Sequence, residues 1–430
     1  MHYFSTNRLS AAATFREAVF RGQPEDMGLY FPSEIPHLSG DWIGQLSDLS
    51  NAQIAFDVIR PFVGDDIDED HLFEICSETV DFPFPLIPLT DRIWAVELFH
   101  GPTLAFKDVG ARFMSRCLQY FSKDQTGKTV VVVATSGDTG GAVAAGFYGL
   151  EGIEVVILYP KGKVSRVQEL QLTTLGGNVT TLELRGTFDD CQSLAKRALA
   201  DPELRSRGHF TSANSINVAR WLPQQFYYFF ALKQWDGPAP VISVPSGNFG
   251  NLASGILAHI SGLPVYGFIA ACNSNDVVPR FMQTEDYLPR PSVPTLSNAM
   301  DVGSPSNFVR VLELFDNNFI DLKEVMKAVS VSDETTVDTM REVYDSSGYV
   351  LDPHGAVGYR ALSDHLMVKG KGSGFFLETA HPVKFDSVNQ ILGNVVETPE
   401  AIRGLSTREK RSIEMDVNYD YLRDLLITKL

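Results

Sequence analysis

One lysine stands between an apolar loop and the start of a helix in the stretch FHGPTLAFKDVGARFM, residues 99–114. Gly101-Pro102 is a turn signal, and apolar residues recur at helical spacing over 111–118. Most lysines lie solvated at a surface, and Lys107 at a helix boundary suits that role. A lysine in an apolar pocket is instead a nucleophile, because burial favours the neutral amine that attacks a carbonyl. Other parts of the sequence decide between these two interpretations.

A glycine-rich turn could hold a phosphate. The stretch VPSGNFGN, residues 244–251, follows the apolar run VISV and precedes a helix. Gly247 and Gly250 allow successive backbone N–H groups to point into one concavity, and the helix N-terminus adds partial positive charge. Neither GK[ST] nor GxGxxG occurs here, which excludes a nucleoside triphosphate loop and the dinucleotide fingerprint. An ordinary strand-to-helix turn is the alternative.

A second turn, ATSGDTGG at residues 134–141, could hold a small carboxylate or phosphate. Thr135, Ser136 and Thr139 supply hydroxyls, and the helix that follows supplies free N–H groups. Asp138 could instead serve only as the N-cap of that helix. The turn therefore indicates either an anion site or a capped helix start.

A third turn, FLETAHP at residues 376–382, also follows a predicted strand, and ligands bind beyond the carboxyl ends of parallel strands. Thr379 could point into the same crevice, whereas His381 suits a capping role. None of the nine histidines lies in an HExxH pair, so we predict no metal site, and the absence of GxSxG argues against a serine hydrolase. A lysine, a phosphate cup and an anion-binding turn are what pyridoxal phosphate needs: Lys107 would form the Schiff base.

The order of elements around these turns is typical of an α/β protein with parallel sheets. Continuous Val/Ile runs alternate with helical segments from about residue 128 onward, as in TVVVVA, IEVVILYP and VISV. The region near 275–345 is richer in Pro, Asp and helical spacing, which predicts a helical insertion. Near the N-terminus, Ser10 is placed like an N-cap. The acidic stretch GDDIDEDHLFEI has His71 where a calcium loop needs glycine, so it predicts an acidic helix start.

Composition narrows the class of protein further. The 430 residues are too many for one core, so we expect two or three domains. A net charge of -17 argues against a nucleic-acid partner. Four separated cysteines without a CxxC pair fit buried thiols in a reducing compartment. No apolar run approaches the roughly 18 residues that span a bilayer, and no secretory leader is recognisable, so we expect a cytoplasmic protein without a membrane partner.

Several segments together resemble the threonine synthase family in its long bacterial and fungal form, over nearly the whole chain. Any one segment could match by chance, but their common order is specific. The matching segments are GLYFP, ELFHGPTLAFKD, ATSGDTG, GFYGL, VVILYPKGKVS, SANSIN, SVPSGNFGN, TLSNAMDV and TAHPVKF.

The resemblance implies a fold-type II pyridoxal-phosphate enzyme, with two parallel-sheet α/β domains and the cofactor in the cleft between them. It implies an N-terminal α+β region over 1–95, a smaller substrate domain over 108–225, and a larger cofactor domain formed by 96–107 and 226–430. We also expect a monomer or a weak homodimer that acts on a small molecule.

The family's site residues map onto this chain motif by motif. Lys107 matches the catalytic lysine that holds the cofactor, and Thr379 matches the residue beside the pyridine nitrogen. Asp138 matches the position facing the ring, where shorter family members have asparagine. The loop around the cofactor phosphate comprises Ser246, Gly247, Asn248, Phe249, Gly250 and Asn251. The implied substrate-binding residues are Thr135, Ser136, Gly137, Thr139, Lys161, Lys163, Ser215, Asn217 and Arg220.

The implied reaction is the last step of threonine biosynthesis, in which O-phospho-L-homoserine and water give L-threonine and phosphate. The Lys107 amine would move protons at Cα and Cβ, phosphate would leave from Cγ, and water would add at Cβ. Two alternatives stay open: another fold-type II enzyme, such as a phospho-amino-acid lyase or a serine/threonine dehydratase, and a catalytically silent homologue that only binds. The basic segments KGKVS and SANSINVAR favour a phosphorylated substrate.

Overall fold

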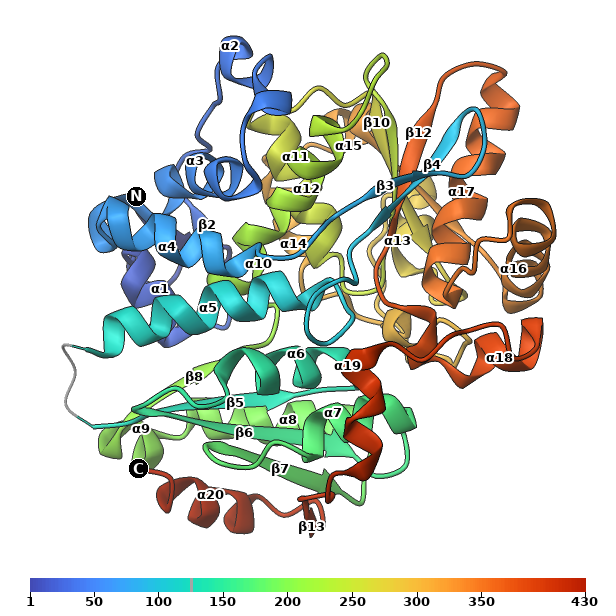
Figure 1. Cartoon of the computed structure of the whole chain (residues 1–430). Coiled ribbons are helices and arrows are strands. Elements are labelled where there is room, and N and C mark those ends of the chain that lie inside the picture. Colours follow the sequence, from blue (N-terminus) through green and yellow to red (C-terminus); the bar gives the residue numbers. More distant parts are fainter. Residues whose placement is uncertain (124–126) are drawn as a thin grey trace.

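Two β-sheets covered by helices organise the chain, whose computed structural model describes residues 1–123 and 127–430 (Figure 1). The larger sheet has the strand order β11-β10-β9-β12-β4-β3, and the smaller has the order β13-β7-β6-β5-β8. Every pairing within them is parallel except that of the edge strand β3 with β4. The predicted α/β class with two parallel sheets is therefore confirmed.

The larger sheet brings three segments that lie far apart in the sequence side by side. Its strands are β3 (Leu86–Pro88), β4 (Ile93–Glu97), β9 (Val241–Pro245), β10 (Gly267–Cys272), β11 (Met326–Ser330) and β12 (Gly374–Glu378). In the register of the central strands, Phe376 lies opposite Ala95 on one side and Ser243 on the other. The carboxyl ends of β4, β12 and β9 consequently meet at one edge of the sheet.

Helices cover both faces of this sheet. They are α10 (Val218–Trp221), η3 (Leu222–Gln225), α11 (Phe226–Lys233), α12 (Gly250–Ile260), α13 (Val277–Thr284), η4 (Asn298–Met300), α14 (Phe308–Glu313), α15 (Phe319–Val325), α16 (Asp333–Ser347), α17 (Pro353–Lys369), η5 (Pro382–Lys384) and α18 (Asp386–Leu392). The region 275–345 is mostly helical, as predicted, but it also contains β11, which pairs with β10 at the sheet edge. The segment MKAVS is short and half exposed, so it lacks the buried apolar run that would have marked it as a strand.

The smaller sheet contains the TSGDTG turn. Its strands are β5 (Thr129–Ala134), β6 (Ile153–Pro160), β7 (Val179–Leu184), β8 (His209–Ser212) and β13 (Ile413–Met415). Its helices are α6 (Asp138–Phe147), α7 (Arg166–Thr173), α8 (Phe188–Ala200), α9 (Pro202–Arg207) and α20 (Tyr419–Ile427). Helix α5 (Lys107–Ser122) runs between the two sheets in Figure 1.

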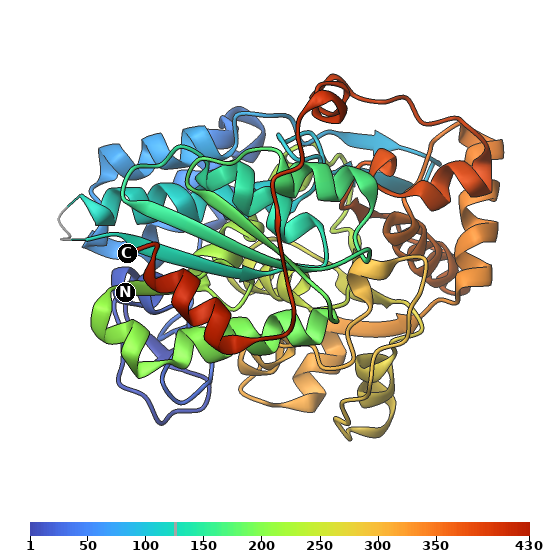
Figure 2. The same cartoon turned by 90° about the horizontal axis from the view of Figure 1, so that it is seen from below.

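The C-terminal segment leaves the larger sheet and returns to the smaller one. After α19 (Glu400–Arg403) and η6 (Leu405–Thr407), β13 pairs with β7 and α20 packs on α8. Figure 2 shows this segment crossing the smaller sheet. The predicted inclusion of all of 226–430 in the larger domain therefore needs correction here. A three-residue strand carries no periodic signal, and its distant partner is not encoded locally.

The N-terminal region combines a small antiparallel sheet with helices. Its elements are β1 (Tyr3–Ser5), α1 (Phe15–Arg21), β2 (Tyr30–Pro32), α2 (Gly40–Ile43), η1 (Leu46–Asp48), α3 (Asn51–Val63), η2 (Gly64–Asp66) and α4 (Glu69–Thr79). The N-cap of α1 is Thr14 instead of the predicted Ser10, because Thr14 and Glu17 form a capping box. The acidic stretch does start a helix, with Asp68 as the N-cap of α4. Since β3 and β4 join the larger sheet, this region ends before the predicted boundary at 95.

Within residues 1–123 and 127–430, no helix is both long enough and apolar enough to cross a lipid bilayer.

Candidate active site

The three strand ends of the larger sheet bring Lys107, Thr379 and the glycine-rich turn together. Strand β9 leads into Ser246, β12 leads into Thr379, and β4 leads into the loop before α5. The Phe106 N–H donates to the Thr379 carbonyl at 2.9 Å, and Ala105 forms a β-bridge with Ala380. Lys107, the first residue of α5, is thereby fixed beside Thr379.

The surroundings of Lys107 disfavour its protonated form. The side chain is partly buried, with Nζ 5.4 Å from the centroid of the Phe106 ring. Burial lowers the pKa of Lys107, the nearby cations Lys384 and Arg220 lower it further, and only the Asp138 carboxylate opposes them. This environment fits the nucleophilic interpretation of Lys107 better than the surface one.

Asp138 is a buried carboxylate paired with a lysine. It is the first residue of α6, and its Oδ1 lies 2.7 Å from Lys384 Nζ and accepts a hydrogen bond of 2.9 Å from Gln168 Nε2. Burial alone would raise the pKa of Asp138, but the charges of Lys384 and Lys107 and these hydrogen bonds outweigh it and lower the pKa. Asp138 therefore remains an anion close to Lys107.

Some polar groups of the turn before Asp138 form hydrogen bonds with each other. Thr135 is buried, and its hydroxyl accepts hydrogen bonds from the N–H groups of Gly137 (3.0 Å) and Gly140 (2.8 Å). Gly137 has φ 143°, and a Cβ there would lie 2.5 Å from Gln168 Cδ, so this position requires glycine. Thr135 and Gly137 therefore shape the turn, whereas the hydroxyl of the exposed Ser136 remains available to a ligand.

The turn 246–251 has the geometry of an anion cup. Phe249 has φ 63°, a rare conformation for a non-glycine residue, and its ring packs on Phe308 at 5.3 Å. Helix α12 begins at Gly250 and directs its free N–H groups into the turn. Asn251 Oδ1 accepts from the Tyr228 hydroxyl at 2.9 Å, while its buried Nδ2 has no partner within the described part of the chain. A buried donor at a helix N-terminus fits a bound phosphate.

Three further residues of the cup are held by protein contacts. The Ser246 hydroxyl donates to the Val244 carbonyl at 2.8 Å. Asn248 donates to Ser215 Oγ at 3.0 Å and accepts from the Ser306 N–H at 2.7 Å. Gly247 lies against η4, where a Cβ would approach Met300 Cα to 2.4 Å. The Ser246 and Asn248 side chains and the close approach of Gly247 to Met300 therefore fix the shape of the cup and leave backbone N–H groups as its ligands.

Arg220 is a buried cation near Lys107. It is 3% exposed and donates to the Ala213 carbonyl, while its Nε is buried without a partner among the described residues. Burial lowers the pKa of Arg220 to about 10, still far above neutrality. None of the ion pairs between described residues includes Arg220. A charged donor of this kind suits a second anion.

The other predicted phosphate ligands differ in their surroundings. Asn217 is buried and donates to the Val19 carbonyl (2.9 Å) and the Ser212 carbonyl (3.1 Å), so its amide is structural and the predicted substrate contact is not supported. The Ser215 hydroxyl accepts from Asn248 and from Asn307 Nδ2 at 2.9 Å. Lys161 is half exposed and forms an ion pair with Glu414 of β13, whereas Lys163 is exposed and Thr139 is partly buried.

Lys384 is a site residue that the sequence interpretation missed. It ends η5, whose N-cap is His381; His381 Nδ1 accepts from the Val383 N–H at 3.1 Å, which confirms the predicted capping role. The motif TAHPVKF contained Lys384, but lysine is rarely buried, and nothing local indicates that this one is. Gln168 was also missed, because its contact with Asp138 depends on how α7 packs on α6.

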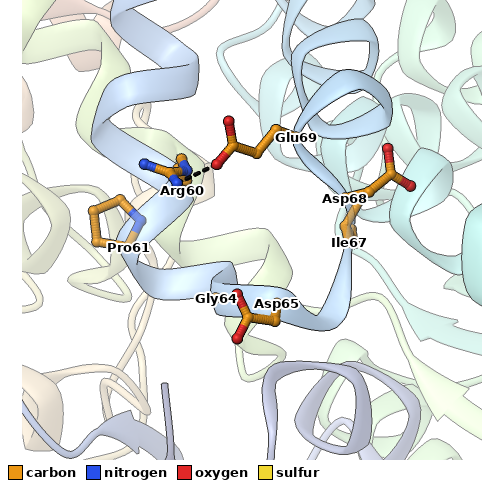
Figure 3. A pocket seen from close by; sticks show the side chains of 7 residues that line it. All are labelled: Arg60, Pro61, Gly64, Asp65, Ile67, Asp68 and Glu69. Atoms are coloured by element: carbon orange, nitrogen blue, oxygen red, sulfur yellow. Dashed lines mark hydrogen bonds and ion pairs between the residues drawn. The ribbon is translucent and has the colours of Figure 1, made fainter.

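A separate hollow of about 600 Å³ lies in the N-terminal region between α3 and α4 (Figure 3). An ion pair between Arg60 and Glu69 crosses it. None of the predicted site residues lines it, so we do not connect it with the chemistry. Its lining residues are Arg60, Pro61, Gly64, Asp65, Ile67, Asp68 and Glu69.

Comparisons with known proteins identify the family of this chain. Residues 82–374 match the model of the family described as "Pyridoxal-phosphate dependent enzyme". Residues 2–80 and 355–425 match the models "Threonine synthase N terminus" and "Threonine synthase, C-terminal". These matches span both sheets and the N-terminal region.

Full-length relatives and solved structures carry the same name. Threonine synthase from Serratia marcescens is 45% identical over 96% of both chains. The crystal structure of threonine synthase from Escherichia coli superposes with a TM-score of 0.93 at 42% identity, covering 100% of both chains. A pyridoxal-phosphate-bound threonine synthase from Brucella melitensis gives 0.92 at 32% identity, covering 100% of this chain and 99% of that one. These full-length matches favour threonine synthase over a phospho-amino-acid lyase, and the chain belongs to the threonine synthase family of pyridoxal-phosphate-dependent lyases.

Proposed function

We propose that this chain converts O-phospho-L-homoserine and water into L-threonine and phosphate. The observation that carries the choice of substrate is the buried Arg220 near Lys107, whose Nε has no partner among the described residues. Because the glycine-rich cup is suited to the cofactor phosphate, a second phosphate needs its own donors. Arg220 supplies a fixed positive charge for it, in a chain of net charge -17.

The residues around Lys107 fit pyridoxal phosphate. Lys107 would hold it covalently, the N–H groups of 247–251 and Asn251 Nδ2 would hold its phosphate, and Thr379 would lie beside its ring nitrogen. When bound, the cofactor supplies an electron sink that makes the protons next to the substrate amine acidic. A hydroxyl at Thr379, in place of a carboxylate, would leave the ring nitrogen mostly unprotonated.

Lys107 is the chain's main proton carrier in this scheme. Its lowered pKa favours the neutral amine, which can accept the proton from substrate Cα and move protons at Cβ. Arg220 would stabilise the phosphate as it leaves from Cγ, since the charge on that group grows during bond cleavage. After phosphate has left, Cγ takes up a proton and becomes the methyl group of threonine. Addition of water at Cβ then forms the threonine hydroxyl, and a proton returned to Cα completes the product.

Substrate comparison tests this proposal. We expect turnover of O-phospho-L-homoserine to threonine and phosphate, and no threonine from L-homoserine or from O-phospho-L-serine. L-homoserine lacks the leaving group and the group that Arg220 would bind, and O-phospho-L-serine lacks Cγ. Comparable turnover of L-serine to pyruvate would instead identify a dehydratase.

Arg220→Ala should weaken kcat/KM for O-phospho-L-homoserine about 10- to 150-fold, the effect of losing one charge-assisted hydrogen bond of about 1.5–3 kcal/mol. Lys163→Ala should also raise KM, but less, because Lys163 is exposed and its charge is screened. Steady-state kinetics and inhibition by inorganic phosphate measure both effects, and the cofactor absorbance should stay unchanged. Wild-type kinetics and phosphate inhibition in both variants would place the substrate phosphate elsewhere.

Thr379→Asp should harm turnover more than stability. A carboxylate beside the ring nitrogen would favour protonation of that nitrogen and change the electron sink, so we expect kcat to fall at least about tenfold. Thr379→Ser, which keeps the hydroxyl, is the matched control and should retain most of the activity. Kinetics and thermal melts on the same samples separate the effects on turnover and on stability. Unchanged turnover in Thr379→Asp would show that Thr379 does not lie beside the ring nitrogen of the cofactor.

We also propose that the chain works in the cytoplasm, as a monomer or a weak homodimer. The free, buried state of Cys76, Cys117, Cys191 and Cys272 fits a reducing compartment. Sedimentation analysis over a range of protein concentrations would test the oligomeric state.

A further inference from the structure

Lys384 links the two sheets at the Lys107 site. Its side chain is 0% exposed, and its Nζ lies 2.7 Å from Asp138 Oδ1 and 2.7 Å from the Thr103 carbonyl oxygen that accepts its hydrogen bond. Lys384 comes from η5, after the larger sheet's β12, and Asp138 comes from α6 of the smaller sheet. A buried ammonium destabilises the fold unless it is paired and hydrogen-bonded, so Lys384 depends on these two partners.

The same hydrogen-bond network includes the loop that carries Lys107. Thr103 donates through its N–H (2.9 Å) and its hydroxyl (2.5 Å) to the buried Asp108, and Gln171 Nε2 donates to the Thr103 carbonyl at 3.0 Å. Lys384 therefore contacts both the loop that precedes Lys107 and the carboxylate of Asp138. These contacts connect four separate segments around one amine.

We propose that Lys384 is a positioning residue that holds Asp138 as an ionised carboxylate beside Lys107 and balances its charge there. The inference rests on the proposed role of Lys107. Shorter family members have an uncharged asparagine at the position of Asp138. The Asp138–Lys384 pair also has no net charge, although Asp138 itself is an anion near Lys107.

The charges around Lys107 determine what removal of either partner does. Asp138 faces it from α6, Lys384 from η5 and Arg220 from α10, while Asp108 on its own helix is turned toward Thr103. Removing only Lys384 leaves the carboxylate of Asp138 unbalanced and stabilises a proton on Lys107 Nζ. Removing only the charge of Asp138 leaves an unbalanced ammonium and destabilises that proton. The two single changes therefore act in opposite directions.

A pH titration of the holoenzyme absorbance, without any amino acid present, tests this directly. The midpoint reports protonation at Lys107 Nζ in its linkage to the cofactor. We expect Lys384→Met to raise the midpoint by about one pH unit and Asp138→Asn to lower it by about one. The double variant should return to within about half a unit of the wild type, because both charges are removed together. Lys371→Met, at an exposed lysine, is the control and should not move the midpoint.

A merely structural role for Lys384 would give a different result. It would lower the melting temperature without opposite shifts, and Lys384→Met and Asp138→Asn would then move the midpoint in the same direction or not at all, which would overturn the proposal. If Lys384→Met does not fold, Asp138→Asn and the double variant still test the proposal. Equal titration midpoints in these two variants would also overturn the proposal. Because the titration contains no substrate, a failure of O-phospho-L-homoserine turnover leaves its outcome unaffected.

Discussion

Lys107→Ala is expected to lower kcat/KM by at least about 10³-fold while the chain still folds, since proton transfer by a placed base contributes about 10²–10⁴-fold. The substitution removes the amine that holds the cofactor and moves the protons. It should cost little stability, because Lys107 is the first residue of α5 and alanine is a good helix former. Steady-state kinetics together with far-ultraviolet circular dichroism measure activity and folding separately.

The matched control lies at the other end of the same helix. Lys123→Ala, at the exposed C-cap of α5, should leave activity unchanged. Borohydride reduction of the wild-type holoenzyme followed by peptide mapping should place the label on Lys107. A label on any other lysine, or substantial activity in Lys107→Ala, would contradict the assignment.

Gly247→Ala should prevent tight binding of the cofactor. The added Cβ would lie 2.4 Å from Met300 Cα, a backbone atom that cannot move away cheaply, so the turn must shift. Each charge-assisted hydrogen bond to the cofactor phosphate that is lost should raise the Kd for pyridoxal phosphate about 10- to 150-fold, at about 1.5–3 kcal/mol per bond. Equilibrium dialysis against pyridoxal phosphate measures this Kd.

Gly404→Ala is the control for the glycine-to-alanine change itself. Gly404 has φ -74°, and no atom lies within 4 Å of the position of its added Cβ. It should bind the cofactor as the wild type does. Wild-type affinity in Gly247→Ala would show that the turn can deform without harm and that the cup is not where the phosphate is held.

The fold could be predicted where local pattern and burial agree. TVVVVA and IEVVILYP are fully or almost fully buried strands, and their β-branched runs indicated this directly. Strand β13 and the return of the C-terminal segment could not be predicted, because three residues give no period and the pairing with β7 bridges more than 200 positions of the sequence. Long-range pairing of short edge strands depends on the assembled sheet.

Some residues of the site could likewise be predicted from the sequence, and others could not. Lys107 and the cup could be proposed from residue types and spacing, because turns after strands and helix N-termini are local features. Asn217 was assigned to substrate, but its amide is used by carbonyls of Val19 and Ser212. Lys384 was missed, because its partner Asp138 lies in α6, which packs with the smaller sheet and is far away in the sequence. The type of a residue indicates which groups it can bind. Only the folded structure shows whether other groups of the protein already occupy it.

The origin of the oxygen atoms in the two products is the most direct measurement of the proposed reaction. When O-phospho-L-homoserine is turned over in water labelled with oxygen-18, elimination breaks the bond between Cγ and oxygen, so phosphate keeps all its original oxygens. Water then adds at Cβ. We therefore expect the label in the hydroxyl of L-threonine and none in phosphate, with equal amounts of both products by mass spectrometry. Labelled phosphate together with unlabelled homoserine would reveal ester hydrolysis and would contradict the proposed reaction.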